Sequence, residues 1–152
     1  YYKNKGQALI TKRPTPVNVV KVDYEKGARI IDAYFEKQST TDYNGVYQGK
    51  YIDFEAKSTN NKTSFPLNNI SKHQIEHLKN VLLHGGICFF IIEFSLINKL
   101  FLLDAKIMIE YIKTSDRKSI PLSVFKEKAL ELSYGFSPRI DYLSAVKKFY
   151  NL

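Results

Sequence analysis

Two short segments of the sequence carry residues that could hold a divalent cation. They are Thr40-Thr41-Asp42 and Asp53-Phe54-Glu55-Ala56-Lys57. Side chains on a strand point alternately to its two faces, so Asp53, Glu55 and Lys57 share one face and the apolar residues between them share the other. We expect the apolar face to enter a core and the charged face to form one surface. Carboxylate oxygens suit a hard ion such as Mg²⁺, and a lysine beside that ion could meet a phosphate or an attacking water.

The two segments lie on neighbouring strands if residues 42–47 and 51–58 form a hairpin. With Gln48-Gly49 as a two-residue loop, Tyr47 pairs with Lys50. Gln is not a favoured first residue of the type I′ turn, which prefers Asn or Asp before Gly. A three-residue loop with its glycine in the left-handed conformation would shift the pairing by one residue. The alternation on the second strand holds in either case.

The two-residue loop places carboxylates directly opposite each other. Asp42 then lies opposite Glu55, and Thr40 lies opposite Lys57. Like charges that face each other across a ladder destabilise it by roughly 0.2–1 kcal/mol. A sequence that places two carboxylates there is therefore expected to hold a cation between them. The alternative is a solvated strand face with an ordinary mixture of charged residues.

Six segments spread over almost the whole chain carry a resemblance to a known family. They are Arg13–Val17, Ser39–Tyr47, Tyr51–Lys57, Lys62–Leu67, His73–His77 and Pro138–Tyr142. Together they closely resemble the RecU family, which are Holliday junction resolvases of Gram-positive bacteria and some of their phages. The resemblance implies a PD-(D/E)xK nuclease fold and an endonuclease that resolves four-way DNA junctions. Family members begin with a helix before the equivalent of Tyr1-Tyr2, and this sequence starts without Met, so we expect that helix to be missing.

The resemblance also implies a cofactor and the residues that bind it. The cofactor would be Mg²⁺, with Mn²⁺ able to substitute. The implied metal-binding residues are Thr40, Asp42, Glu55 and Gln74. Lys57 would stabilise the charge that develops on the phosphate, and so would be catalytic together with Asp42 and Glu55. Asp53 shares the charged strand face and is expected to support the ligands rather than bind the ion.

Gln74 has two competing roles in this interpretation. Ser71-Lys72-His73-Gln74 is a capping box, in which the glutamine side chain bonds back to the Ser71 amide. Of the two roles we favour the metal. The overlapping stretch His73–His77 also matches H-x-x-E-H, in which two histidines one helical turn apart bind zinc. A third zinc ligand would be needed and no downstream residue stands out, so an exposed polar helix face near DNA is the preferred interpretation.

The charge of the chain favours a polyanionic partner. The formal net charge is +8 and the isoelectric point is about 9.4, which suits nucleic acid better than a membrane surface. The alternative is a merely soluble basic protein. Basic residues crowd the first quarter of the chain, together with several aromatic residues. The residues expected to contact DNA phosphates are Lys12, Arg13, Lys21, Lys26, Arg29 and Lys37.

The length and composition predict one soluble domain. A chain of 152 residues can form a single domain with a sizeable core. No apolar run approaches the roughly 20 residues of a transmembrane helix, so we expect no membrane partner. The single cysteine, Cys88, excludes an intramolecular disulfide and lies in an apolar run, which indicates a buried residue rather than a nucleophile. A reducing cytoplasm is the expected compartment.

The pattern of elements predicts an α/β fold. We expect a mixed β-sheet flanked by helices as a restriction-endonuclease-like core, with residues 14–37 as an inserted, protruding basic stalk. Apolar alternation and continuous apolar runs predict strands at 7–13, 17–22, 42–47, 51–58, 87–94 and 100–103. Helices are expected at 28–35, from Ser71 to the glycines at 85–86, and at 105–112, 123–130 and 141–150. The strand at 87–94 is apolar throughout, which indicates a central position covered on both faces.

These features favour a nuclease for four-way junctions that works as a two-fold homodimer, because two symmetry-related strands must be nicked. A second hypothesis is a DNA-binding modulator of the recombinase, with a vestigial metal site, and a recombinase is a candidate partner in either case. A third is a restriction-type nuclease, since the same core serves many substrates. A vestigial site would not need to keep Thr40, Asp42, Glu55 and Lys57, so their presence favours an enzyme.

Overall fold

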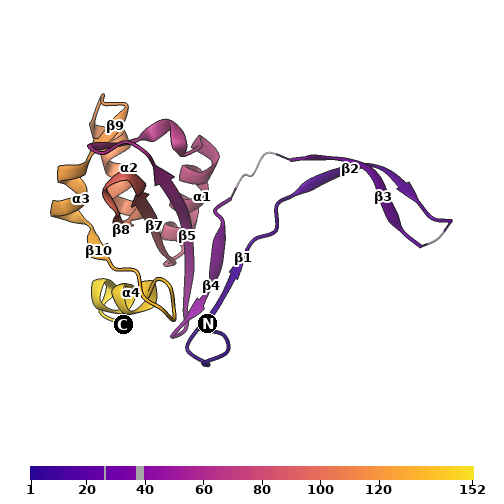
Figure 1. Cartoon of the computed structure of the whole chain (residues 1–152), viewed down its shortest axis with the longest axis horizontal. Helices are drawn as coiled ribbons and strands as arrows, with labels where there is room; N and C mark the ends of the chain where they lie inside the picture. The colour runs from indigo at the N-terminus through magenta and orange to yellow at the C-terminus, as the bar shows by residue number, and fades with distance from the viewer. Residues whose placement is uncertain (26, 37–39) are drawn as a thin grey trace.

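The molecule consists of a body built on a mixed sheet and a two-stranded ribbon that projects from it (Figure 1). The structure is a computed structural model and describes residues 1–25, 27–36 and 40–152. Two of the residues expected to bind DNA, Lys26 and Lys37, lie outside the described residues. None of the helices in the described part of the chain is both long and apolar enough to cross a membrane.

The body contains a six-stranded sheet in the order β1-β4-β5-β7-β8-β10. Its strands are β1 (Leu9–Lys12), β4 (Tyr43–Tyr47), β5 (Lys50–Thr59), β7 (Ile87–Phe94), β8 (Lys99–Asp104) and β10 (Leu130–Leu132). The β5–β7 pair is parallel and the other pairs are antiparallel. The helices are α1 (Lys72–Leu83), α2 (Ala105–Thr114), α3 (Leu122–Lys128) and α4 (Tyr142–Tyr150). Two short strands, β6 (Ser64–Pro66) and β9 (Ser119–Pro121), form a separate antiparallel pair.

Strand β7 divides the core into two layers, as its continuous apolar sequence predicts. Cys88, Phe90 and Ile92 pack with residues of α1, α2 and α3 on one face. Phe89 and Ile91 pack with α4 and the apolar face of β5 on the other. The predicted mixed sheet with helices on both faces is therefore confirmed. Burial raises the pKa of the Cys88 thiol to about 12, which agrees with a structural cysteine.

Helix α1 begins and ends where the sequence predicts. The Ser71 side chain accepts a hydrogen bond from the Gln74 amide at 3.2 Å, and the Gln74 side chain accepts one from the Ser71 amide at 3.1 Å. Both bonds satisfy amides that have no partner within the helix. Leu78 is fully buried against the sheet. Gly85 adopts φ of 79°, a conformation that suits glycine after a helix end.

The β4–β5 hairpin has the predicted register. Tyr47 pairs with Lys50 and Tyr43 pairs with Phe54. Both loop residues have positive φ, 48° at Gln48 and 73° at Gly49, as a type I′ turn requires. The three-residue loop is therefore excluded, although Gln is an uncommon residue in the left-handed region.

Two predicted helices differ in the structure. Residues 28–35, expected to be helical, form the strand β3 (Arg29–Phe35), which pairs with β2 (Val17–Asp23). The run is rich in residues that favour strands, and a helix there would have no core to pack on, whereas a strand finds its hydrogen bonds in β2. The helix expected at 123–130 ends at Lys128, because Leu130 opens the edge strand β10.

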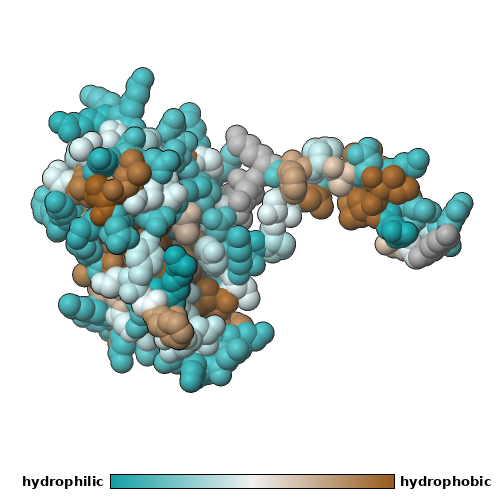
Figure 2. Space-filling model, in the orientation of Figure 1, coloured by the Kyte–Doolittle hydropathy of each residue, from teal (hydrophilic) through white to brown (hydrophobic). Residues whose placement is uncertain are grey.

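The β2–β3 ribbon extends away from the body and none of its residues is buried. Its exposed side chains are nonetheless often large and apolar: Val17, Val19, Val20, Tyr24, Ile30, Ile31, Tyr34 and Phe35 are all at least 44% exposed. Figure 2 shows these apolar patches along the ribbon, well separated from the body. The assignment of residues 14–37 as a functional stalk stays a prediction.

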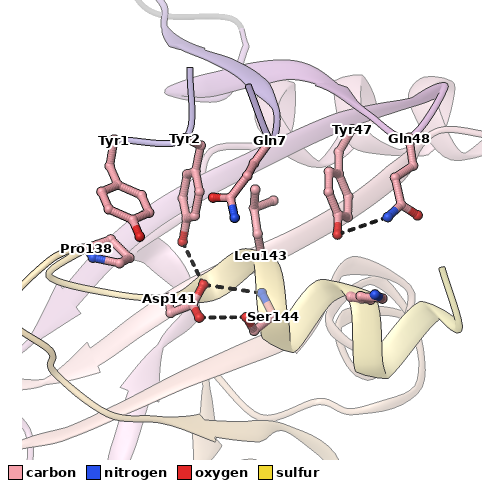
Figure 3. A pocket seen from close by; sticks show the side chains of 10 residues that line it. Tyr1, Tyr2, Gln7, Tyr47, Gln48, Pro138, Asp141, Leu143 and Ser144 are labelled. Atoms are coloured by element: carbon pink, nitrogen blue, oxygen red, sulfur yellow. Dashed lines mark hydrogen bonds between the residues drawn. The ribbon is translucent and has the colours of Figure 1, made fainter. Parts of the chain in front are cut away.

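The first residues of the described chain are tied to α4 (Figure 3). The Tyr2 hydroxyl donates to Asp141 Oδ1 at 3.0 Å, and Asp141 also caps α4 by accepting from the Ser144 amide. Hydrogen bonds from Ser144 and Tyr2 hold the pKa of Asp141 below its usual value. The pocket beside them, about 400 Å³, contains none of the predicted metal ligands. It lies between the N-terminal segment, the β4–β5 turn and α4.

The unfavoured residue in the turn gives a stability prediction. Gln48→Asn should stabilise the protein by up to about 1 kcal/mol, because Asn tolerates the left-handed conformation better than Gln. A rise of a few degrees in the thermal midpoint is expected for a chain of this size. Gln48→Val serves as the matched control and should lower the midpoint. Equal midpoints for all three proteins would mean that the turn conformation is not strained.

Candidate metal centre

The charged face of β5 lies beneath helix α1 rather than on the surface. Asp53 and Glu55 are only 0% and 1% exposed, while Ala56, expected to enter the core, is exposed. The predicted separation of the two faces is correct, because Ile52 and Phe54 pack in the layer against α4. The prediction that the charged face forms an open surface is wrong, because α1 packs over it. Buried carboxylates need compensating partners.

Each oxygen of the Glu55 carboxylate has a partner. Oε2 accepts a hydrogen bond from the backbone amide of Asp42 at 2.9 Å, and Oε1 lies 2.8 Å from Lys57 Nζ. Asp42 therefore meets Glu55 through its backbone amide, and Lys57 approaches the same carboxylate from two residues further along β5. The pairing of Thr40 with Lys57 and a cation between the two carboxylates stay predictions. Lys57 keeps 25% of its side chain exposed, so its ammonium group lies between the buried carboxylate and solvent.

The electrostatics around Glu55 favour an additional cation. Burial raises the pKa of Glu55, and the negative charge of Asp42 raises it further. The hydrogen bond and charge of Lys57 lower it, but do not cancel the effect of burial. The charge of Lys57 therefore only partly offsets the effect of burial on Glu55, and an additional cation nearby would favour the ionised carboxylate. The residues present fit a hard divalent cation, because carboxylate oxygens are the ligands that such ions prefer.

The other two predicted ligands flank this pair. Gln74 is 5% exposed, and its side-chain oxygen makes the capping bond to Ser71. The helix-capping role is thus seen directly. An amide oxygen has two lone pairs, so capping does not by itself prevent a second contact. Thr40 is half-buried two residues before Asp42. Metal binding by Thr40 and Gln74 stays a prediction.

The zinc interpretation of His73–His77 finds no support in the geometry. His77 Nε2 lies 2.9 Å from Asp53 Oδ2, and Glu76 pairs at the surface with Lys79 at 3.4 Å. Within residues 1–25, 27–36 and 40–152, no group of three or more His, Cys, Asp and Glu side chains is placed to hold a metal. A cation near Asp42 and Glu55 would need neutral oxygen ligands to complete its shell.

Asp53 is the centre of a hydrogen-bond network that sequence reasoning missed. Arg13 Nη2 and Nη1 lie 2.7 and 3.3 Å from its two carboxylate oxygens. The Thr41 hydroxyl donates to Oδ1, and the Tyr51 hydroxyl donates to Oδ2 at 3.1 Å. The His77 ring completes the shell from α1. The only signal in the sequence was the position of Asp53 on the charged face, which does not name its partners.

This network gives Asp53 a different electrostatic state from Glu55. Burial alone would raise the pKa of Asp53. Hydrogen bonds from Arg13, Thr41 and His77 outweigh the burial and hold the pKa below its usual value. Asp53 is therefore a fixed carboxylate whose charge is already compensated. Its supporting role in the metal centre stays a prediction.

Two hollows border Lys57. One, of about 610 Å³, lies on the α1 side and is also lined by Lys72, His73 and Gln74. The other, of about 360 Å³, is lined by Arg139, Tyr134 and Glu93 among others. The Tyr134 hydroxyl donates to Glu93, which engages that carboxylate. A polyanionic strand that reached Lys57 would find basic side chains in both hollows.

The residues expected to bind DNA do not form one group. Lys12 is exposed at the end of β1, and Lys21 and Arg29 are exposed on the ribbon. Arg13 is different, because its side chain is 19% exposed and its guanidinium group binds Asp53. The structure therefore engages Arg13 in an internal contact, whereas the three other described residues are accessible.

Comparison with known proteins agrees with this picture. Residues 1–148 match the family model of RecU, recombination protein U. A protein from Geobacillus sp. strain WCH70 is 54% identical over 155 residues, covering 99% of this chain and 77% of its own. One from Pediococcus pentosaceus is 55% identical over 153 residues, covering 97% and 76%. Both are named Holliday junction resolvase RecU.

A solved structure resembles part of the chain more distantly. Hjc of Archaeoglobus fulgidus, a Holliday junction resolvase, aligns with a TM-score of 0.44 and 13% sequence identity. The alignment covers 68% of this chain and 78% of Hjc.

The fold and the site together define an α/β protein in which Glu55 and Lys57 lie on β5 and Asp42 lies just before β4. The chain belongs to the RecU family, because the family model spans nearly all of it and relatives share more than half of its residues. The resemblance inferred from six sequence segments is confirmed.

The paired carboxylates predict how the site responds to substitution. Asp42→Asn and Glu55→Gln should each weaken binding of Mg²⁺ or Mn²⁺ by roughly 10–100-fold or more, because each removes an oxygen ligand and a negative charge. Calorimetry on the DNA-free protein measures this directly. Glu76→Gln, a surface carboxylate on α1, is the matched control and should bind the ion normally. Unchanged affinity in both site variants would place the ion elsewhere.

Proposed function

We propose that the protein is a Mg²⁺-dependent endonuclease that resolves four-way DNA junctions. The observation that carries the proposal is the meeting of Asp42, Glu55 and Lys57 at one partly buried point, in a chain of the RecU family. Relatives across the length of the chain are named Holliday junction resolvase. Mn²⁺ should replace Mg²⁺, since both accept oxygen ligands.

The residues divide the chemistry between them. Asp42 and Glu55 would hold the ion, with Thr40 and Gln74 completing or orienting its ligands. When bound, the ion polarises the scissile phosphate and lowers the pKa of a water molecule. Lys57 would donate to the phosphate oxygen on which negative charge develops. The buried surroundings of Glu55 strengthen these interactions, because they lower the local dielectric constant.

The Lys57–Glu55 ion pair suggests how the site is arranged before a cation and a phosphate bind. Lys57 Nζ occupies one oxygen of Glu55 and so compensates part of its buried charge. A cation bound at Glu55 would take over that compensation. The lysine, which is partly exposed, would then be available for the phosphate. The same pair thus favours the ionised form of the Glu55 carboxylate and places the Lys57 ammonium group beside the expected metal position.

A second copy of the chain would complete the enzyme. Resolution of a four-way junction requires two nicks on symmetry-related strands, which suits a two-fold homodimer. The β2–β3 ribbon supports this, because it exposes many large apolar side chains with no core of its own. A patch of this kind marks an interaction surface. The basic residues Lys21 and Arg29 on the same ribbon would face junction DNA.

The partners and compartment follow from this proposal. The substrate is four-way junction DNA in the bacterial cytoplasm, where the free thiol of Cys88 stays reduced. A recombinase that builds such junctions is a candidate partner. The alternative, a modulator of the recombinase without essential nuclease activity, requires the metal centre to be dispensable.

One assay tests the proposal. The protein is incubated with a four-way junction and with a linear duplex of the same arm sequence, with Mg²⁺ and with EDTA. Selective, metal-dependent nicking of the junction at symmetric positions is expected. Cleavage of both substrates at equal rates would indicate a restriction-type nuclease instead. Binding without cleavage under all metal conditions would favour the modulator.

Substitution of Lys57 separates chemistry from metal binding. Lys57→Ala should lower single-turnover cleavage by roughly 10²–10³-fold, the scale of losing one transition-state donor. Metal affinity should stay the same or increase, because the variant removes a cation that competes for Glu55. Lys72→Ala is the matched control, a lysine that borders the same hollow without contacting Glu55. A large loss of metal binding with normal cleavage at saturating metal would show that the role of Lys57 is misassigned.

The ribbon predicts junction selectivity. The double variant Lys21→Ala, Arg29→Ala should weaken junction binding more than duplex binding. It should also flatten the log–log salt dependence by about 0.9 for each lost phosphate contact. Lys126→Ala, Lys128→Ala on α3 is the control and removes the same charge from the exposed surface of the body. Equal losses of affinity for junction and duplex would mean that Lys21 and Arg29 bind DNA in general and do not select the junction.

A further inference from the structure

We propose that Arg13 is a positioning residue: anchored by Asp53, it holds the segment that carries Asp42 in place and ties the base of the β2–β3 ribbon to the metal centre. The inference rests on the proposed function for the role of Asp42. It assigns Arg13 an internal task instead of the DNA contact expected from its charge.

Arg13 holds the backbone on both sides of the Asp42 amide. Its own backbone N–H donates to the Asp42 carbonyl at 2.7 Å. Its Nη1 donates to the Thr41 carbonyl at 3.0 Å and also to the Thr41 hydroxyl. The peptide between Thr41 and Asp42 is the one whose N–H reaches Glu55. Arg13 therefore fixes the peptide that brings the two carboxylate residues together.

Asp53 gives the guanidinium group a rigid anchor. It is fully buried and faces Arg13 with both oxygens, so the two side chains form a forked pair. Tyr51 and His77 hold the same carboxylate from β5 and α1. A planar guanidinium can bind two oxygens and a carbonyl in fixed directions, whereas a lysine is a single point charge. The site therefore calls for arginine rather than for any basic residue.

The place of these residues in the chain gives the contact a second consequence. Arg13 directly follows β1, where the chain leaves the sheet for the ribbon, and Thr41 lies where the chain returns to β4. One side chain thus clamps the outgoing and the returning segments together. A displacement of the ribbon, for example on contact with DNA, would act on the bonds between Arg13 and Thr41. Thr41 is the residue next to Asp42.

The geometry leaves little of Arg13 for DNA. Nη1 donates to Thr41 and Asp53, and Nη2 donates to Asp53 and to the Tyr51 hydroxyl at 3.0 Å. A phosphate contact through Nη1 or Nη2 would compete with the bonds to Thr41 and to the buried carboxylate of Asp53. Lys12, the preceding residue, is exposed and makes the natural comparison, because it has the same charge without these contacts.

The test compares Arg13→Lys with Lys12→Ala in the whole protein. In Arg13→Lys we expect Mn²⁺ affinity, measured by calorimetry without DNA, to fall roughly 10–100-fold, the usual range for residues that orient metal ligands. Without metal, the affinity for the junction should stay within about twofold of the wild-type value. The slope of its log–log salt dependence should stay unchanged. Lys12→Ala should do the opposite, with normal metal affinity and a salt slope flatter by about 0.9.

A readout that needs neither metal nor DNA completes the experiment. Hydrogen exchange of the Asp42 amide, followed by NMR, should become faster in Arg13→Lys and in Asp53→Asn, and stay unchanged in Lys12→Ala. If Arg13→Lys does not fold, Thr41→Val is scored in the same way, because it removes one hydroxyl of the network. Non-additive effects of Arg13→Lys and Asp53→Asn in the double variant are expected for residues that act as a unit.

The outcomes separate this inference from the proposed function. A flatter salt slope for Arg13→Lys with normal metal affinity and normal exchange would overturn it and make Arg13 a phosphate contact. Unchanged values in all three measurements would overturn it as well. If instead the wild-type protein binds no divalent ion, the proposed function fails, while the exchange data still decide whether Arg13 positions the Asp42 segment.

Discussion

The structure depends on how two carboxylates on one face of β5 are compensated after α1 has buried them. Asp53 and Glu55 are two residues apart and equally inaccessible, yet their partners differ. Asp53 is in contact with an arginine, two hydroxyl groups and a histidine. Glu55 is in contact with one lysine and one backbone amide. Removing a partner from a buried charge is strongly destabilising, so each set of contacts constrains the elements that supply it. These contacts tie together β5, α1 and the segments that follow β1 and precede β4.

The difference in compensation leaves the two carboxylates in different electrostatic states. A group whose pKa is held low by several fixed donors is ionised and rigid, and so suits a structural anchor. A group whose pKa is raised by burial and by a neighbouring carboxylate gains most from an added cation. Burial, charge and hydrogen bonds thus distinguish Asp53, whose charge is already compensated, from Glu55, which an added cation would stabilise. The alternation of side chains on the strand could not make that distinction, because it places both residues on the same face.

Local patterns predicted those parts of the fold that are decided locally. The register of the β4–β5 hairpin follows from its loop length, and the start of α1 follows from its capping box. The pairing of Arg13 with Asp53 joins residues far apart in sequence, and no periodic pattern encodes it. Burial of the charged face depends on where α1 packs, which is a tertiary event. Strand β3 was taken for a helix for a similar reason, because its pairing with β2 outweighs the preference of an isolated segment.

The β2–β3 ribbon and the proposed metal centre require different degrees of rigidity, and the Arg13–Asp53 contact lies between them. An exposed two-stranded ribbon is marginally stable by itself and is free to adapt to a partner. A metal centre requires ligands held within a fraction of an ångström. Both depend on the same stretch of chain. The chain leaves β1 at Arg13, forms the ribbon and returns to the sheet next to Asp42. The buried carboxylate of Asp53 anchors Arg13 at the point where the outgoing and returning segments meet. Under the positioning role proposed for Arg13, a partner that displaced the base of the ribbon would act on the Arg13–Asp53 pair, which lies next to the segment that carries Asp42.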